Sequence, residues 1–334
     1  ADFIGSIMGE LLKPKTCGVG YNSIQFDDEV TRFTAWRNFH DPYSREWRND
    51  NSRWDLLDVA RAFYVISPQE IEWPLGQNGY VSFRLQDLTS ANGIEHRGAH
   101  DALSDVMATI ELAKRLRGAN VSLFETLYFQ RSKQALYDLI DIDGLTPLVH
   151  VSGALGSARH NFTLVAPLAW HPKNNSEVIV MDLSESPDFF FADLENIKQK
   201  YFLRSRDPMD GRRRSPIYSV RLNRAPALLS TKWLTPLIAE RFALVGEQYR
   251  AHLSLLRDMR GRDPHAFISK VQAMYPDRDF PQKDDPDLQL YDGFISHSDR
   301  VLCNRVRTAT PDRLRNESWP FEDRRLPELL FRFR

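Results

Sequence analysis

The segment GYNSIQFDDEVTR (residues 20–32) passes from a strand pattern to a helix pattern within a few residues. The overlapping segment TCGVGY (residues 16–21) has the composition of a short buried strand, and Asn22 and Ser23 form a polar turn. Apolar residues then recur at helical spacing, and Asp27 suits the positive N-terminal end of a helix. The ends of strands are where α/β proteins present ligands. The segment therefore predicts an α/β region with polar residues at a strand end.

A second segment, GAHDALSDV (residues 98–106), begins a predicted helix that runs to Gly118. His100 precedes Asp105 by five residues, which on a helix separates the two by roughly 140°. They are therefore not two ligands on one face. We expect the aspartate to hold a metal ion and the histidine to act as a general base. On this motif alone, the more common explanation is that the pair has no function: a histidine at a helix start is often followed by an exposed aspartate. The predicted buried stripe is Ala102, Val106, Ile110, Ala113 and Leu116.

The length of 334 residues favours two domains, or two and part of a third. Helical patterns occupy residues 3–12, 54–66 and 82–94, so the first region is α/β or α-rich and ends near residue 118. A helical stretch and then short strand patterns follow between residues 120 and 222, which predicts a small sheet or barrel. Helical patterns return from about residue 235.

Composition excludes several classes of protein. Charged residues make up 27% of the chain and the net charge is −1, so no overall field indicates nucleic acid or membrane. The longest apolar runs, such as LVAPLAW (residues 164–170), are shorter than the roughly 20 residues of a membrane-spanning helix. No signal peptide is recognisable. With two distant cysteines, Cys17 and Cys303, both expected to be buried and inert, the sequence predicts a soluble, cytoplasmic protein.

Asn22, Phe26 and Asp27, followed by His100 and Asp105, resemble the second and third motifs of the DEDD superfamily of 3′→5′ exonucleases, in the histidine subgroup. The chain is most similar to one family, the single-strand-specific DNA exonuclease I of bacteria. The segments that carry this likeness, in chain order, are GYNSIQFDDEVTR, NDNSRWDLLDV, SFRLQDLT, ANGIEH, AHDALSDV, PLVHVSGALG, VAPLAWHP and LYDGF.

The resemblance implies an α/β plus β fold. It would comprise an incomplete RNase H-like exonuclease domain (residues 1–118), an SH3-like domain with flanking helices (residues 119–275) and the start of a C-terminal helical region (residues 276–334). The implied activity is hydrolysis of single-stranded DNA from the 3′ end, in DNA repair, with two Mg²⁺ ions per active site, for which Mn²⁺ can substitute. Asp27 and Asp105 would hold metal, and His100 would accept the proton of the attacking water. The protein would be a monomer that binds single-stranded DNA and, as a further partner, single-strand-binding protein.

The chain departs from the family in its first motif, an Asp-x-Glu that must precede Asn22. The pattern occurs only at Asp27-Asp28-Glu29 and Asp193-Leu194-Glu195. The first could be a strand-borne first motif, with Asp55 or Asp58 as the second motif, although its periodicity is helical. The missing motif and the uncapped helical start predict a fragment that is inactive by itself.

Two other functions stay open. One is a catalytically dead module that binds single-stranded DNA or another protein. The other is an exonuclease of the same superfamily that acts on RNA or oligonucleotides, which is disfavoured because such enzymes lack the second domain.

Several residues are candidates for DNA contact. Residues 32–54 mix aromatic and basic side chains, and Tyr43, Trp47 and Arg53 suit base stacking and phosphate binding. The resemblance adds Asn22, Phe26, Arg84, His150 and Arg159. Residues 198–224 hold nine Lys and Arg against two acids, which indicates either phosphate attraction or a solvated loop.

Overall fold

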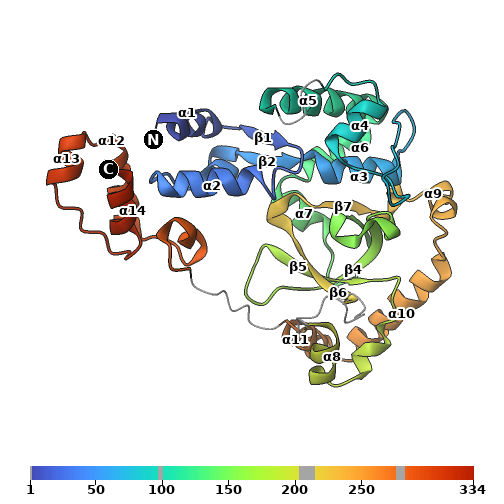
Figure 1. Cartoon of the computed structure of the whole chain (residues 1–334). Coiled ribbons are helices and arrows are strands. Elements are labelled where there is room, and N and C mark those ends of the chain that lie inside the picture. Colours follow the sequence, from blue (N-terminus) through green and yellow to red (C-terminus); the bar gives the residue numbers. More distant parts are fainter. Residues whose placement is uncertain (1, 97–100, 203–214, 276–282) are drawn as a thin grey trace. The chain divides into compact units, whose positions relative to one another are not determined.

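The structure is a computed structural model that describes residues 2–96, 101–202, 215–275 and 283–334. Unit 1 of the chain consists of Ala1–Trp54 and Arg278–Arg334, and unit 2 of Asp55–Asp277. Figure 1 shows the helices and strands of each unit.

The N-terminal half of unit 1 follows the predicted order of elements. It contains α1 (Asp2–Leu11), β1 (Cys17–Gly20), α2 (Asp27–Arg37) and β2 (Ser52–Asp55), and β1 pairs with β2. The predicted helix-to-strand-to-helix pattern is confirmed. The prediction that β1 is buried was wrong: Val19 is exposed and Cys17 only half-buried, because in the described residues β2 is the only strand beside β1.

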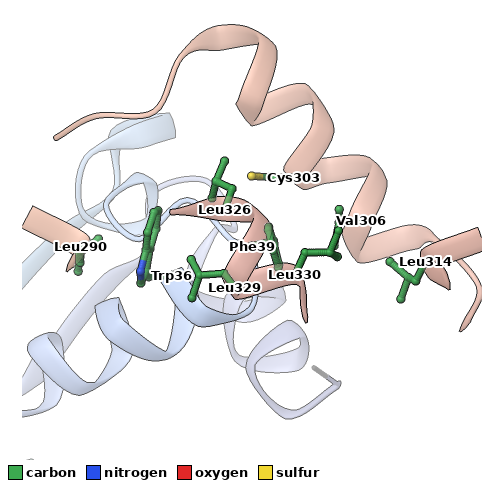
Figure 2. Packing of buried hydrophobic residues seen from close by; sticks show 9 residues of the cluster. All are labelled: Trp36, Phe39, Leu290, Cys303, Val306, Leu314, Leu326, Leu329 and Leu330. Atoms are coloured by element: carbon green, nitrogen blue, oxygen red, sulfur yellow. The ribbon is translucent and has the colours of Figure 1, made fainter. Parts of the chain in front are cut away.

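The C-terminal half of unit 1 packs its apolar side chains against α2. It contains the 3₁₀ segment η8 (Pro286–Tyr291) and the helices α12 (His297–Thr308), α13 (Pro311–Asn316) and α14 (Leu326–Phe333). The indole nitrogen of Trp36 donates to the carbonyl oxygen of Pro286 at 2.9 Å. Burial raises the pKa of the Cys303 thiol to about 12, so this cysteine is inert as predicted. Figure 2 shows the core residues Trp36, Phe39, Leu290, Cys303, Val306, Leu314, Leu326, Leu329 and Leu330.

Unit 2 begins with helices. They are α3 (Leu56–Ile66), α4 (Leu85–Ala91), α5 (Ala102–Ala119), α6 (Val121–Phe129) and α7 (Lys133–Leu139). The predicted extent of α5 is confirmed, but its predicted buried stripe was wrong except at Leu116. Val106 is 54% exposed and Ile110 41% exposed, whereas Ala108 and Leu112 are fully buried. The apolar residues of α5 lie on two faces. Its contacts with α3, α4 and α6 accompany burial of the face that carries Ala108, Leu112 and Leu116.

A five-stranded antiparallel sheet follows, with the strand order β6-β5-β4-β3-β7 in the described residues. Its strands are β3 (Leu148–Val151), β4 (Phe162–Trp170), β5 (Glu177–Asp182), β6 (Ile217–Arg221) and β7 (Ala227–Ser230). The helices α8 (Leu194–Tyr201), α9 (Pro236–Arg241), α10 (Gly246–Arg262) and α11 (Pro264–Ala273) complete unit 2. The predicted small sheet is confirmed. None of the helices in the described ranges is long and apolar enough to span a membrane.

Candidate active site

The turn between β1 and α2 places three predicted site residues at the surface of unit 1. Asn22 adopts a left-handed backbone conformation, with φ of 59°. Phe26 lies just before α2, and Asp27 is the first residue of that helix. The side chains of Asn22, Phe26 and Asp27 are all exposed. An exposed carboxylate at a helix start is accessible to a cation or to a nucleic acid.

The neighbouring Asp28 has a different environment, because it points into unit 1. Its two oxygens accept from Arg45 Nη2 at 2.6 Å and from Arg53 Nη1 at 2.7 Å, and all three side chains are buried. Asp28 is therefore a structural ion-pair residue.

The strand-borne alternative for Asp27-Asp28-Glu29 was wrong, because these residues form the first turn of α2. The two aspartates that would have completed that alternative have local roles. Asp55 caps α3 by accepting from the amide of Leu57, and Asp58 pairs with Arg61 at 2.5 Å. Asp193 likewise caps α8, as its helix-start pattern predicted.

Arg53 takes part in a larger buried network. It approaches Glu46 at 3.4 Å, and Glu46 also binds Arg32 through two hydrogen bonds of 2.7 and 2.8 Å. Burial lowers the pKa of Arg32, but its bonds to Glu46 outweigh this and raise it above its usual value. Tyr43 is half-buried beside this network, with its ring 5.6 Å from the Arg32 guanidinium. Tyr43, Trp47 and Arg53 are the DNA-contact candidates from residues 32–54. Of these three, Trp47 is exposed, at 64%.

Asp105 lies in the first turn of α5, in unit 2. The helix is capped by Asp101, whose side chain accepts from the amide of Ser104 at 3.1 Å. The Asp105 side chain is 44% exposed, and its Oδ1 lies 2.7 Å from Nε2 of His96. The other ring nitrogen of His96 lies 3.2 Å from the hydroxyl of Thr89. His100 falls outside the described residues. His96 is the last residue of ANGIEH, one of the segments that carry the family likeness, but neither helical periodicity nor charge predicts its contact with Asp105.

The chemistry of Asp27 and Asp105 suits a divalent cation, since hard cations prefer carboxylate oxygens. Asp27 belongs to unit 1 and Asp105 to unit 2. Within the described ranges, no group of three or more His, Cys, Asp or Glu side chains could hold a metal ion. The donor type therefore fits, while the residues described supply fewer carboxylates than a two-cation site needs.

The candidate DNA contacts of unit 2 differ in exposure. Arg84 is exposed just before α4. His150 is buried in β3, and its Nδ1 lies 2.8 Å from the hydroxyl of Tyr218. Arg159 is half-buried and pairs with the buried Asp182 at 2.6 Å. Burial lowers the pKa of Arg159, but the bond to Asp182 outweighs this and raises it overall.

The basic segment, residues 198–224, is described only at its two ends. Lys198 lies 3.5 Å from Glu195, and Arg221 lies 3.2 Å from Glu177. Arg212, Arg213 and Arg214 fall outside the described residues. The charges at both ends are thus at least partly balanced by acids.

A family model described as "Exonuclease" matches residues 6–113, a range that contains Asp27 in the first turn of α2 and Asp105 in the first turn of α5. Models described as "Exonuclease I SH3-like domain" and "Exonuclease I C-terminal domain" match residues 131–277 and 284–334. The chain belongs to the exonuclease I family. Its fold is an RNase H-like exonuclease domain followed by an SH3-like domain, and both the predicted family and fold class are confirmed.

Two curated relatives are similar along the whole chain. Exodeoxyribonuclease I of Escherichia coli strain K12 is 41% identical over 336 residues, which cover 100% of this chain and 70% of the relative. The exodeoxyribonuclease I of Haemophilus influenzae is 39% identical over 338 residues, with the same shares of 100% and 70%.

Three solved structures of exonuclease I are similar to this one, and the first two are of the E. coli enzyme. The complex of exonuclease I with a dA16 oligonucleotide has a TM-score of 0.92 at 40% identity, covering 100% of this chain and 70% of that one. A zinc-bound complex with single-stranded DNA has a TM-score of 0.90 at 41% identity, with the same coverage. A structure of SSB and exonuclease I with the inhibitor CFAM has a TM-score of 0.87 at 39% identity, covering 100% and 69%.

Proposed function

We propose that this protein is an exodeoxyribonuclease that hydrolyses single-stranded DNA from its 3′ end. The observation that carries the proposal is the similarity of the whole chain to exodeoxyribonuclease I, together with the exposed carboxylate of Asp27 and the partly exposed carboxylate of Asp105. The SH3-like segment favours a DNA exonuclease over the RNA-directed and oligonucleotide-directed members of the superfamily.

Divalent metal ions are part of this proposal, with Mg²⁺ as the natural ion, two ions per complete site and Mn²⁺ as a substitute. Asp27 and Asp105 would hold them. The chemistry that such a pair of ions supplies is polarisation of the attacking water and stabilisation of the leaving oxygen. His100 would accept the proton of that water. A zinc-bound relative supports the use of divalent ions.

The DNA strand is proposed to contact exposed residues of both units. Asn22, Phe26 and Trp47 of unit 1 and Arg84 of unit 2 offer stacking surfaces and polar or cationic groups. For Arg53, His150 and Arg159 we propose structural roles, since their polar atoms already bind Asp28, Tyr218 and Asp182. Tyr43 would support the first of these networks.

We further propose single-strand-binding protein as a partner, a monomeric state, and a division of the chain into residues 1–118, 119–275 and 276–334. The structure of a relative with SSB supports the first point, and the ranges of the three family models support the last.

The activity is tested with a hybrid enzyme. It consists of the 334 residues preceded by a segment that carries the Asp-x-Glu expected for the family. We expect the hybrid to release mononucleotides from the 3′ end of labelled single-stranded DNA in Mg²⁺, and to leave RNA and blunt duplex DNA largely intact. The 334-residue chain alone should bind single strands without releasing nucleotides, because it has Asp27 and Asp105 but not the two carboxylates of the family's Asp-x-Glu. A hybrid that binds DNA but never cleaves it would refute the proposed activity.

A further inference from the structure

We infer that His96 is a positioning residue that holds the carboxylate of Asp105 in place for a divalent cation. This inference rests on the proposed function, in which Asp105 is a metal ligand. It assigns a role to His96 in addition to the one proposed for His100. The geometry that carries it is the 2.7 Å contact between Nε2 of His96 and Oδ1 of Asp105.

His96 is fixed from behind by a buried residue of α4. The Thr89 side chain is fully buried, and its hydroxyl lies 3.2 Å from Nδ1 of His96. The same hydroxyl is within 2.9 Å of the carbonyl of Leu85 and 3.0 Å of that of Gln86, which holds it on α4. The imidazole therefore has a defined partner on each side, and the order of contacts runs from α4 through His96 to α5.

The exposures of the two side chains suit a buried histidine that positions an accessible carboxylate. His96 is only 6% exposed, while Asp105 is 44% exposed. An ionised carboxylate can only accept, so Nε2 of His96 must carry the hydrogen between them. The bond restrains rotation of the Asp105 carboxylate while the exposed part of that group can still receive a cation. Hydrogen bonds of this kind to metal-binding carboxylates typically change metal affinity about 10- to 100-fold.

A purely structural role for His96 would be to tie α4 to α5. That tie is already made without it, because Leu88 of α4 and Ala108, Leu112 and Leu116 of α5 are fully buried. Arg115 of α5 also donates to the backbone carbonyl of Asn92, next to the end of α4. Loss of His96 should therefore change the metal site much more than the packing of the helices.

The test uses the 334-residue chain with Mn²⁺ as the probe. Bound Mn²⁺ broadens nearby amide NMR signals even at low occupancy. Weak binding is therefore measured as the increase in amide line width of residues 101–109 with each addition of Mn²⁺. The matched variants are His96→Gln, which keeps an N–H near the position of Nε2, and His96→Leu, which keeps the volume without a donor. Thr89→Val removes the hydroxyl behind His96, and Asp105→Ala removes the ligand.

We expect Asp105→Ala to abolish the broadening, His96→Leu to reduce it about 10- to 100-fold, and His96→Gln to restore most of it. Thr89→Val should give an intermediate loss. Amide spectra away from residues 101–109 should match the wild type in each variant. If His96→Leu and wild type broaden equally while Asp105→Ala does not broaden, His96 has no positioning role. If Asp105→Ala broadens as wild type does, the proposed ligand role of Asp105 fails instead.

Discussion

Nη1 of Arg53 lies 2.7 Å from Oδ2 of Asp28, and both side chains are less than a tenth exposed. Asp27, one residue earlier, is exposed. Two adjacent aspartates at the start of α2 thus have opposite environments, one inside an ion-pair network and the other open to solvent. Their substitutions should have opposite consequences.

Asp28→Asn should lower the free energy of unfolding by about 3–5 kcal/mol, because Arg45 and Arg53 would keep buried charges without their acceptor. Asp27→Asn, the matched control, should change it by no more than about 0.5 kcal/mol. Denaturant titration of the 334-residue chain measures both. Equal, small losses in the two variants would mean that the buried network contributes little to stability.

His40 gives unit 1 a pH dependence. Burial, and then the charge of Arg307, lower the pKa of His40 from 6.5 to about 4, and its Nδ1 lies 3.0 Å from a guanidinium nitrogen of Arg307. Between these pH values the unfolded chain binds the proton more readily than the folded one. Stability is therefore complete above about pH 6.5 and falls as the pH drops toward 4.

The change that tests this is His40→Asn. Because His40 is partly exposed, we expect a screened effect on the order of 1 kcal/mol: relative to the variant, wild type should lose about that much between pH 6.5 and 4. Denaturant midpoints of both proteins across this range provide the measurement. A difference that stays constant with pH would show that His40 titrates normally in the folded protein.

Substitution of a buried candidate for DNA contact should lower stability, whereas substitution of an exposed candidate should lower the affinity for DNA. His150→Leu should cost about 1–3 kcal/mol of stability, since it leaves the Tyr218 hydroxyl without its ring partner, and should leave the affinity of the folded protein for single strands unchanged. Arg84→Ala should weaken binding several-fold with little effect on stability. Fluorescence anisotropy with a labelled oligonucleotide, beside thermal unfolding, distinguishes the two. The reverse pattern would place the strand against β3.

The role of the basic segment, residues 198–224, is tested by the salt dependence of single-strand binding. If Arg212, Arg213 and Arg214 contact phosphate, replacing all three with Gln should flatten the salt dependence of single-strand binding by up to about 0.7 per lost contact. Arg221→Gln is the control, because its guanidinium already pairs with Glu177. A slope that does not change in the triple variant would assign these arginines to a solvated loop.

The positions of the helices could be predicted from the sequence better than which face of each helix is buried. Caps, acids and periodicity placed α2, α3 and α5 closely, because these signals are local. The buried face of α5 could not be chosen in this way, since Val106 and Ile110 on one side are as apolar as Ala108 and Leu112 on the other. Contacts with the other helices α3, α4 and α6 decide which side is buried, and the periodicity of α5 carries no information about them.

The site shows the same limit. Asp27 and Asp105 could be proposed as metal ligands from the sequence because each stands in a motif at a helix start. Arg53 is predicted to contact DNA because its neighbours are aromatic and basic. Its ion pair with Asp28 could not be predicted, because Asp28 is 25 residues away in sequence and only the fold brings the two together. His96 was missed for a similar reason, because it reaches Asp105 from the segment after α4.

The most direct test of the central claim, that Asp105 holds metal and His100 accepts a proton, compares two variants of the hybrid enzyme. For each, calorimetric Mn²⁺ titration is combined with the rate of nucleotide release from single-stranded DNA. Asp105→Ala should lose both metal binding and activity, because water replaces an anionic oxygen poorly. His100→Ala should keep its metal while the rate falls about 10²- to 10⁴-fold, the usual contribution of a positioned base. If His100→Ala loses metal as severely as Asp105→Ala, or if the 334-residue chain alone releases nucleotides, the assignment is contradicted.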